Sequence, residues 1–443
     1  MSTFYKWGSG IAPNHPNVAH AHDEFLITED GERIIDAASG ALVVNLGHSV
    51  PGVADRMKQQ AESVAYVSTS YFATEPAEQL AETVRSLTPD PLTASFFVTS
   101  GSEANETAIK LARAYHLACG NGQKQTIISR YGSYHGATLA ALSVSDNPSR
   151  KAAYAPLLRS GPKLEAAYPY RWKHGGTPKE QAVSAARELE TVIKRNGPET
   201  IAAFIAEPVS GSTLGVAYPH PAYYREVRRI CDTYDVLFIA DEVMTGFGRT
   251  GEYFAVDHAA VAPDILTVGK GLSSGYAPIA AAIVHERIAD TFDASTEHSF
   301  EHGHTYSANP LSTAIANEIV GHYTEDVLSD VRRLGDRLYA EVEPLEQHPH
   351  VGEIRNLGLM LGIELVAETE TKRPFPSELN VHRKLFDACL DRGVYVYPGS
   401  GSVDGQRGDH LLVGPPFITS EQSIETIGTV LREAIRDVTE DLN

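Results

Sequence analysis

Two apolar segments of this sequence each run into a residue that can take part in chemistry. Residues 236–240 lead directly into Asp241, and residues 265–268 lead through a glycine into Lys270. The gap between the two segments is long enough for a helix, as in a sheet whose parallel strands are joined by helices. The carboxyl ends of such strands meet at one edge of an open α/β sheet, which is where ligands bind. The pattern therefore predicts an α/β fold with Asp241 and Lys270 in one ligand site.

Strand-like and helix-like segments alternate from about residue 51 to residue 310. Residues 103–117 place apolar side chains at helical spacing, whereas short apolar runs predict strands at 94–99, 126–129 and 201–206. This alternation predicts a parallel or mixed sheet with helices on both faces.

A smaller lobe is expected from the two ends of the chain. Residues 25–28 and 33–36 are joined by a segment that contains Asp30-Gly31, which is the signal of a β-hairpin. Helical patterns follow residue 310 and lead to a strand-like run at 361–366. The expected division of the chain is 1–55 for the N-terminal part of the smaller α+β lobe, 56–312 for the larger lobe and 313–443 for the C-terminal part of the smaller lobe.

The charge and cysteine content exclude several classes of protein. The net charge of −20 argues against a nucleic-acid binder, because phosphates would be repelled. No apolar run approaches the length needed to cross a membrane, and the first residues lack the layout of a signal peptide. The three cysteines are far apart, which suits a reducing, cytoplasmic location rather than a disulfide framework. Of the 37 basic residues 12 are lysine, which either salt adaptation or genomic base composition explains.

Lys270 and Asp241 are the pair that pyridoxal-phosphate (PLP) chemistry needs. A lysine amine forms the Schiff base with this cofactor, and a carboxylate pairs with its pyridinium nitrogen. Ser100-Gly101-Ser102 lies between a strand and a helix, where small residues and the helix N-terminus suit a phosphate. A serine that only caps the helix is the alternative, because the same residue types begin many structural helices. The presence of Lys270 and Asp241 in the same chain leads us to favour the phosphate site.

Two further motifs favour structural roles. Residues 246–251 match G-x-G-x-x-G, but the glycines do not directly follow the strand, and no acid ends a strand about 20 residues later, so we expect a turn. Candidate metal ligands crowd one segment, namely His298, Glu301, His302 and His304. They lack the i, i+4 helical pair of a zinc site, and we expect a solvated loop with no metal.

The motifs resemble those of the class III PLP-dependent aminotransferases, which have the fold type I architecture. The resemblance covers essentially the full chain. It implies a large domain with a mixed, mostly parallel seven-stranded sheet flanked by helices, a smaller α+β domain from both termini, and a homodimer or dimer of dimers with active sites at the interface. The matching motifs, in the family's order and approximate spacing, are Ser100-Gly101-Ser102-Glu103-Ala104, Tyr134-His135-Gly136, Glu207-Pro208, Asp241-Glu242-Val243, residues 246–251, Gly269-Lys270-Gly271 and Thr305-Tyr306-Ser307-Ala308-Asn309-Pro310.

The resemblance implies a role for each matched residue. Lys270 would hold PLP and, once released by substrate, move the proton between the substrate carbon and the cofactor. Asp241 would keep the pyridine nitrogen protonated. The other implied cofactor contacts are Tyr134 stacked on the ring, Val243 on its opposite face, Glu207 beside it, Gly101 and Ser102 at the phosphate, and Thr305 reaching the phosphate from a neighbouring subunit.

Two positions resemble the ω-amino acid and amine:pyruvate transaminases within this family. Ornithine and 4-aminobutyrate types carry a glutamate where this chain has Ser212, and usually a glutamine where it has Met244. A transaminase of the resembled group moves an amino group from a primary amine or ω-amino acid to pyruvate or another 2-oxo acid, by a ping-pong mechanism.

The resemblance also indicates which residues contact the substrate. It aligns Leu42 with a pocket aromatic, so the pocket is either wider here or shaped by Trp7, Tyr71 and Phe72. Core or interface packing is the alternative for each of these residues. Arg407 is the candidate arginine for the acceptor's carboxylate, with a surface role as the alternative.

Three other functions stay open. A mutase or decarboxylase of the same fold is one, because residues 241–247 resemble the aminomutase that acts on glutamate semialdehyde, whereas residues 248–251 resemble the transaminases. A 4-aminobutyrate- or ornithine-type transaminase that uses 2-oxoglutarate is the second. A catalytically silent binding protein is the third, and it would be marked by loss of Lys270 or Asp241, both of which are present.

Overall fold

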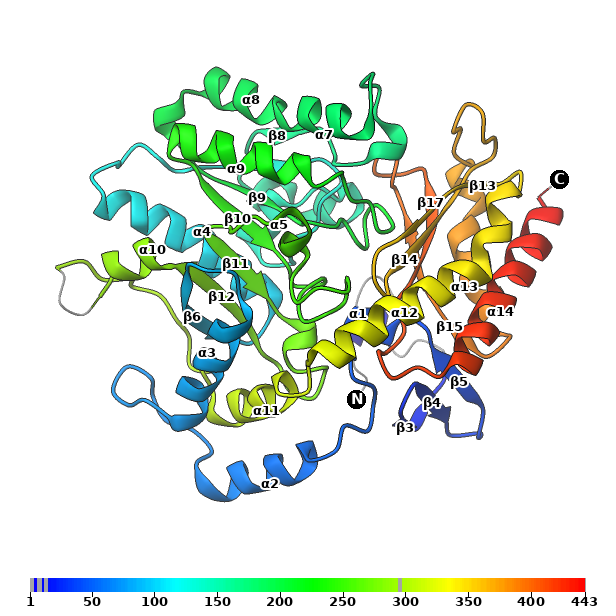
Figure 1. The fold of residues 1–443 in the computed structure, drawn as a ribbon, viewed down its shortest axis with the longest axis horizontal. Helices are drawn as coiled ribbons and strands as arrows, with labels where there is room; N and C mark the ends of the chain where they lie inside the picture. The colour runs from blue at the N-terminus through cyan, green and yellow to red at the C-terminus, as the bar shows by residue number, and fades with distance from the viewer. Residues whose placement is uncertain (1–3, 6–9, 12–14, 294–296, 443) are drawn as a thin grey trace.

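The larger lobe of this computed structural model, which describes residues 4–5, 10–11, 15–293 and 297–442, is built around seven strands (Figure 1). Their order across the sheet is β6-β12-β11-β10-β9-β7-β8. β12 is antiparallel to both of its neighbours, and the other neighbouring pairs are parallel. The expected mixed, mostly parallel sheet is confirmed. The strands are β6 (Leu92–Val98), β7 (Thr126–Arg130), β8 (Lys163–Leu164), β9 (Ile201–Ala206), β10 (Leu237–Asp241), β11 (Ile265–Val268) and β12 (Ala280–His285).

Helices cover both faces of this sheet because successive side chains of each strand point to opposite faces. Ile205 and Ile239 pack with residues of α4 (Gly101–Ala118) and α10 (Glu286–Thr291) on one face. Phe204 and Phe238 point to the other face, where Phe238 stacks on Tyr224 of α9 (Ala222–Tyr234). Burial on both faces explains why the central strands read as unbroken apolar runs.

Three helices that are far apart in the sequence pack together beside β6 in the larger lobe. They are α2 (Val53–Ser63), α3 (Glu75–Leu87) and α11 (Pro310–Val320) (Figure 1). The expected divisions of the chain at 55/56 and 312/313 fall inside α2 and α11, and the packing supports placing both helices whole in the larger lobe. The remaining helices of this lobe are α5 (Leu139–Val144), α6 (Pro148–Lys151), α7 (Pro178–Ala186) and α8 (Glu188–Asn196), with short 3-10 helices at Ala152–Leu157, Pro169–Arg171, Pro198–Thr200, Ala255–Ala259 and Lys270–Leu272.

The smaller lobe combines two four-stranded sheets. One has the order β13-β14-β17-β16 and is antiparallel, with β13 (Val351–Asn356), β14 (Leu361–Leu365), β16 (Tyr397–Ser400) and β17 (Asp409–Val413). The other has the order β15-β5-β4-β3, with β3 (Val18–His22), β4 (Phe25–Thr28), β5 (Arg33–Asp36) and β15 (Val394–Tyr395). The expected hairpin of β4 and β5 is confirmed, and the parallel pairing of β15 with β5 joins the two ends of the chain.

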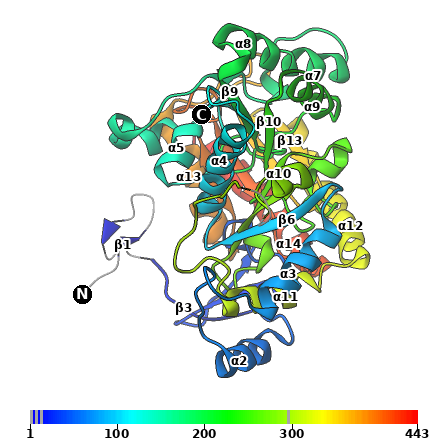
Figure 2. The ribbon, with the colours of Figure 1, turned by 90° about the vertical axis from the view of Figure 1, so that its left-hand side faces the viewer.

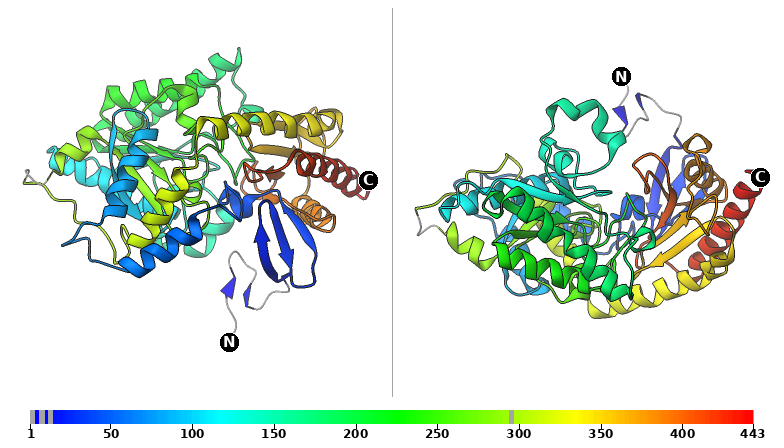
Figure 3. Two further views of the ribbon diagram at one scale, coloured as in Figure 1. Left: turned by 60° about the horizontal axis from the view of Figure 1, so that its bottom comes forward. Right: turned by 90° about the horizontal axis from the view of Figure 1, so that it is seen from above.

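Three long helices complete the smaller lobe. α13 (Val381–Leu390) and α14 (Glu421–Glu440) pack against each other, and α12 (Glu325–Val342) packs along α14. α12 runs from the end of the larger lobe across to the smaller one (Figure 3). Two 3-10 helices, at Glu343–Gln347 and Ser377–Leu379, lie between these elements in the sequence.

Buried arginines join the two lobes. Arg249 lies in the 246–251 segment, which forms the expected turn, and donates to the carbonyl oxygens of Leu359 at 3.1 Å and Pro415 at 2.7 Å. Arg355 of β13 donates to the carbonyl oxygen of Gly215 in the larger lobe at 2.7 Å. These contacts fix the smaller lobe against the carboxyl edge of the larger sheet.

The described N-terminal residues form a short pairing of their own. β1 (Phe4–Tyr5) pairs with β2 (Gly10–Ile11), and this pair lies to one side of the main body (Figure 2). α1 (Ser39–Leu42) then leads from the smaller lobe toward the larger one. Of the helices in the described parts of the chain, none combines the length and the apolar character that crossing a membrane requires.

Candidate active site

A cavity of about 400 Å³ opens at the carboxyl edge of the larger sheet. The segments that follow β6, β7, β9, β10 and β11 line it, because these parallel strands all end at this edge. Asp241 ends β10 and Lys270 follows β11, and both side chains line the cavity as the sequence predicts. The wall also contains these expected residues: Gly101, Ser102, Tyr134, Glu207 and Val243.

Three donors hold the carboxylate of Asp241. Nδ1 of His135 lies 2.7 Å from Oδ2 of Asp241, and the amide of Asn105 donates to the same oxygen at 2.8 Å. The N–H of Val243 donates to Oδ1 at 3.1 Å. Thr267 donates to the amide oxygen of Asn105 at 2.8 Å, which fixes the orientation of that amide. This donor set suits a carboxylate anion, the form that can pair with a protonated pyridine nitrogen.

Lys270 stands in an unusual backbone conformation. Its φ is 41°, in the left-handed region that residues with a Cβ rarely adopt, and it begins a short 3-10 turn. A Cβ on the preceding Gly269 would make ordinary contacts, at 3.4 Å from both Ala280 and Val243. The turn places the Lys270 side chain on the wall that Asp241 also lines.

The start of α4 combines a helix cap with a close backbone approach. Oγ of Ser100 accepts a hydrogen bond from the N–H of Glu103 at 3.3 Å, so Ser100 caps the N-terminus of α4. Gly101 and Ser102 nevertheless line the cavity, and a Cβ on Gly101 would lie only 2.6 Å from Cγ1 of Val243. The first N–H groups of a helix have no partner within it and carry a positive dipole end, so this wall fits a phosphate.

Glu207 is a buried acid beside Asp241. Burial raises the pKa of Glu207 to about 8, and the charge of Asp241 adds to the effect, while Arg130 opposes it. The N–H of Tyr134 donates to Oε2 of Glu207 at 3.3 Å, and Arg130 donates to its backbone carbonyl oxygen. Tyr134 and Glu207 therefore line the same part of the cavity wall.

Comparison with known proteins decides the family, since the class III aminotransferase model matches residues 10–435. The chain belongs to the class III aminotransferases. It is 39% identical over 434 residues to an uncharacterized aminotransferase of Bacillus subtilis, covering 98% of this chain and 97% of that relative. A γ-aminobutyrate transaminase of Solanum lycopersicum is 34% identical over 431 residues, covering 95% of this chain and 80% of the relative. The crystal structure of an ω-transaminase of Pseudomonas jessenii in complex with PMP superposes with a TM-score of 0.89 at 32% identity, covering 96% of this chain and 93% of that one.

Class III aminotransferases use PLP, and the cavity of this member fits the cofactor. It offers an amine at Lys270, a carboxylate at Asp241 for the ring nitrogen, and the α4 N-terminus for the phosphate. Gly101 has no side chain and packs closely on Val243, so it presents its backbone to the phosphate position.

The expected substrate residues are not gathered in this cavity. Leu42 is buried between the lobes, where it packs with Val209, Met360 and other apolar residues, and it does not line the cavity. Tyr71 and Phe72 lie outside the cavity on the surface of the chain, where they are 83% and 64% exposed. Trp7 lies outside the described residues.

Arg407 and Thr305 also lie away from the cofactor cavity. Nε of Arg407 donates to Oδ2 of Asp404 at 2.7 Å on the exposed loop before β17. Thr305 is exposed and lines a different surface cavity, together with Tyr66 and His302. A contact of Thr305 with the phosphate of its own chain does not fit this placement.

Four cavity residues complete the wall. Ser212 and Met244 line it, as their alignment with substrate-discriminating positions leads one to expect. The sequence analysis does not predict the contacts of Asn105 and His135 with Asp241, although His135 lies in a matched motif and Asn105 directly follows one. Asn105 is 136 residues from Asp241 in the sequence, and no local pattern joins them.

Proposed function

We propose that this class III aminotransferase is an ω-transaminase. It moves an amino group from a primary amine or ω-amino acid to pyruvate or another 2-oxo acid, so the donor leaves as an aldehyde or ketone and the acceptor as an amino acid. The observation that carries the proposal is the placement of Lys270 and Asp241 on the wall of one cavity at the carboxyl edge of the sheet. The same cavity serves both half-reactions in turn, which makes the mechanism ping-pong.

The residues have separate tasks in this proposal. Lys270 would hold PLP through its amine, and its Nζ would carry the proton to and from the substrate carbon. Asp241 would pair with the ring nitrogen, and the cofactor would supply the electron sink for the deprotonated carbon. Tyr134, Val243 and Glu207 would contact the ring. Gly101 and Ser102 would bind the phosphate.

We also propose a homodimer, or a dimer of such dimers, with the sites at the interface. Thr305 then completes the phosphate site of a second copy, and Tyr71 and Phe72 contribute to its substrate pocket. The strong exposure of Tyr71 and Phe72 in the single chain supports this, because large aromatic side chains at the surface favour an interaction site. A cytosolic location suits the three cysteines, all of which are free thiols.

Two other reactions compete with this proposal. Ser212 and Met244, which replace the glutamate and glutamine of the 4-aminobutyrate and ornithine types, support an amine:pyruvate enzyme over a 2-oxoglutarate enzyme. The likeness to a γ-aminobutyrate transaminase at 34% identity keeps the 2-oxoglutarate reaction as the second candidate. A mutase or decarboxylase of the same fold would give no net transfer to an acceptor.

Two measurements test the proposal. PLP-supplemented, desalted protein is reduced with borohydride and digested, and mass spectrometry should find a pyridoxyl group on Lys270. The visible absorbance of the bound cofactor should then bleach with an amine and return with pyruvate, with formation of alanine. Absence of the modification from Lys270 would refute the cofactor assignment, and bleaching without recovery by pyruvate or 2-oxoglutarate would refute the transaminase.

A further inference from the structure

A tyrosine outside the cofactor cavity contacts the turn that carries Lys270. The phenol of Tyr323 donates a hydrogen bond to the carbonyl oxygen of Gly271 at 2.6 Å. Gly271 directly follows Lys270, and both residues belong to the 3-10 turn Lys270–Leu272. Tyr323 is buried and does not belong to the cavity wall, so it can influence the cofactor site only through its neighbours.

The backbone of this turn needs contacts from outside to keep its conformation. The φ of Lys270 is 41° and that of Ser274 is 48°, both in the left-handed region that residues with a Cβ rarely adopt. Such conformations persist only where the surrounding structure holds them. The carbonyl oxygen of Gly271 accepts the N–H of Ser274 at 3.2 Å, and the phenol of Tyr323 adds a second, shorter hydrogen bond to the same oxygen.

Close packing supports the same turn from two other segments. A Cβ on Gly271 would overlap the side-chain amide of Asn45 and would lie 3.2 Å from the carbonyl oxygen of Gly246. The N–H of Leu46 donates to Oγ of Ser274 at 2.9 Å, which ties the end of the turn to the segment after α1. The sheet brings the cofactor lysine to its carboxyl edge, whereas these contacts fix the conformation of the turn.

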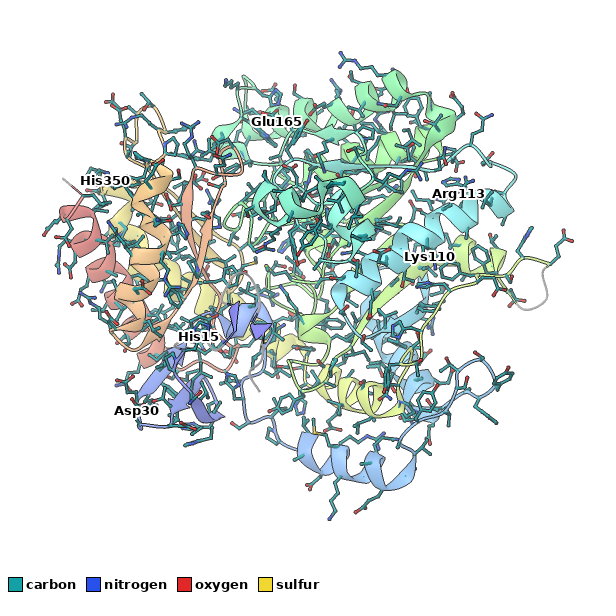
Figure 4. The ribbon with its side chains drawn as sticks, turned by 180° about the vertical axis from the view of Figure 1, so that it is seen from behind. His15, Asp30, Lys110, Arg113, Glu165 and His350 are labelled. Carbon is teal, nitrogen blue, oxygen red and sulfur yellow. The ribbon has the colours of Figure 1, made fainter. Side chains whose placement is uncertain are left out.

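Aromatic packing at the boundary of the two lobes, which Figure 4 shows from behind, fixes the ring of Tyr323. The ring lies between α11 and α12 in the sequence, and its centroid is 5.7 Å from that of Phe247 in the larger lobe. On the side of the smaller lobe its centroid is 6.2 Å from that of Phe417, which also contacts Arg249. These contacts restrict the ring and keep its hydroxyl directed at the turn.

The phenol of Tyr323 keeps its proton and can therefore donate. Burial raises the pKa of Tyr323, and the nearby Arg249 and a hydrogen bond with Asn45 oppose that rise only in part. A protonated phenol has one O–H donor, which the carbonyl oxygen of Gly271 accepts. The hydrogen bond is thus present throughout the neutral pH range.

We propose that Tyr323 is a positioning residue that holds the Lys270 turn in the conformation that attaches PLP. This inference rests on the proposed cofactor role of Lys270. Attachment forms a C=N bond between Nζ of Lys270 and the aldehyde carbon of PLP, and the aldehyde oxygen leaves as water. Without the Tyr323 hydrogen bond the strained turn relaxes in the cofactor-free protein, and attachment must restore it. A contact that pre-organises a binding group strengthens binding by removing this cost.

The test compares two ligands that differ only in the group that meets Lys270. PLP carries the aldehyde, whereas pyridoxamine phosphate (PMP) carries an amine in its place and cannot condense with a lysine. The Kd of each is measured by calorimetric titration of cofactor-free wild type, Tyr323→Phe and Tyr218→Phe. We expect Tyr323→Phe to raise the Kd for PLP by about five- to tenfold, because one buried hydrogen bond is lost, and to change the Kd for PMP by less than about twofold.

Tyr218→Phe is the matched control, because it also removes only a hydroxyl. The phenol of Tyr218 donates to the carbonyl oxygen of Asn356 across the two lobes at 2.9 Å, and Tyr218 does not line the cofactor cavity. Both of its Kd values should match wild type. Equal rises for PLP and PMP in Tyr323→Phe, no rise for PLP, or the same rise in Tyr218→Phe would overturn the positioning role.

These titrations require no amine donor and no acceptor, so they separate the inference from the proposed reaction. If wild type transfers no amino group while the preference for PLP over PMP still depends on Tyr323, the reaction is wrong and the positioning role stands. If borohydride reduction leaves no pyridoxyl group on Lys270 of wild type, the cofactor role of Lys270 fails and the positioning role fails with it.

Discussion

Nδ1 of His135 lies 2.7 Å from Oδ2 of Asp241, and both side chains are buried at the carboxyl end of β10. Burial lowers the pKa of His135, so its imidazole ring is neutral. Because Oδ2 of Asp241 accepts the hydrogen bond, the one N–H of this ring is at Nδ1. A neutral imidazole orients the carboxylate without cancelling its charge, as a protonated one would. The carboxylate of Asp241 is therefore held in one orientation on the wall of the cavity.

Replacement of that charge should remove most of the activity. Asp241→Asn preserves the size of the side chain but leaves the ring nitrogen without an anionic partner. We expect kcat to fall on the order of 10²–10³-fold, the effect of losing one preorganised electrostatic contact. Steady-state kinetics with a saturating amine and pyruvate measure this. Asp326→Asn on the exposed first turn of α12 is the matched control, and a kcat for Asp241→Asn within a few fold of that control would contradict the role.

The buried acid Glu207 predicts a pH dependence of stability. Its pKa is raised by burial from 4.5 to about 8, so the folded protein binds this proton more tightly than the unfolded chain does. Protonated Glu207 therefore contributes to the free energy of unfolding. This contribution is fully present below pH 4.5 and is lost as the pH rises through about 8. Glu207→Gln keeps the shape and removes the titration, so the melting temperature of the variant minus that of wild type should increase across this window.

Scanning calorimetry of the cofactor-free protein at a series of pH values measures that difference. Cofactor-free protein is used because a bound cation near Glu207 would shift its titration. The matched control is Glu62→Gln at an exposed position of α2, for which we expect a flat difference. A flat or falling curve for Glu207→Gln would show that this carboxyl does not carry the raised pKa.

Most of the larger lobe and the centre of the site could be predicted from the sequence. The run 201–206 is buried on both faces, so its composition alone identifies a central strand. Asp241 ends such a strand and Lys270 follows another after one glycine, and the geometry of parallel strands then brings them to one edge. The positions of these two residues depend on little beyond the sheet itself.

The substrate residues could not be predicted in the same way, because their directions depend on loops. Leu42 has a φ of 55°, in the left-handed region. Its side chain packs among apolar residues of both lobes and does not line the cofactor cavity. Arg407 forms an ion pair with Asp404, three residues earlier. The sequence shows both residues but does not show whether Arg407 pairs with Asp404 or binds a substrate.

The packing of Gly101 predicts a selective loss of cofactor affinity. In Gly101→Ala the new methyl group would lie 2.6 Å from Cγ1 of Val243, so the start of α4 or the side chain of Val243, both on the cavity wall, must shift. Alanine is otherwise favourable in a helix, by up to about 1 kcal/mol over glycine, so the helix itself should not be weakened. We expect the Kd for PLP to rise at least about tenfold, a free-energy change of about 1.4 kcal/mol, in a fluorescence titration.

Gly122→Ala serves as the control for that titration. A Cβ on Gly122 would meet only the end of Leu117 at 3.8 Å, an ordinary contact, so its Kd for PLP should match wild type. An unchanged Kd for PLP in Gly101→Ala would mean that Val243 moves without cost and that the packing of Gly101 on Val243 does not determine the affinity for the cofactor.

The cross-strand pair of Gly399 and His410 supports the cavity from the smaller lobe. The two residues face each other on β16 and β17, and Nε2 of buried His410 donates to the carbonyl oxygen of Ser212 at 3.2 Å. A Cβ on Gly399 would overlap the His410 ring, so Gly399→Ala must displace the imidazole or the strand. We expect a loss of stability of about 1–3 kcal/mol, as for other overpacked cores, seen as a lower midpoint of urea unfolding. Gly175→Ala, where a Cβ meets nothing within 4 Å, is the control, and equal midpoints for the two variants would show that the ring yields freely and does not fix Ser212.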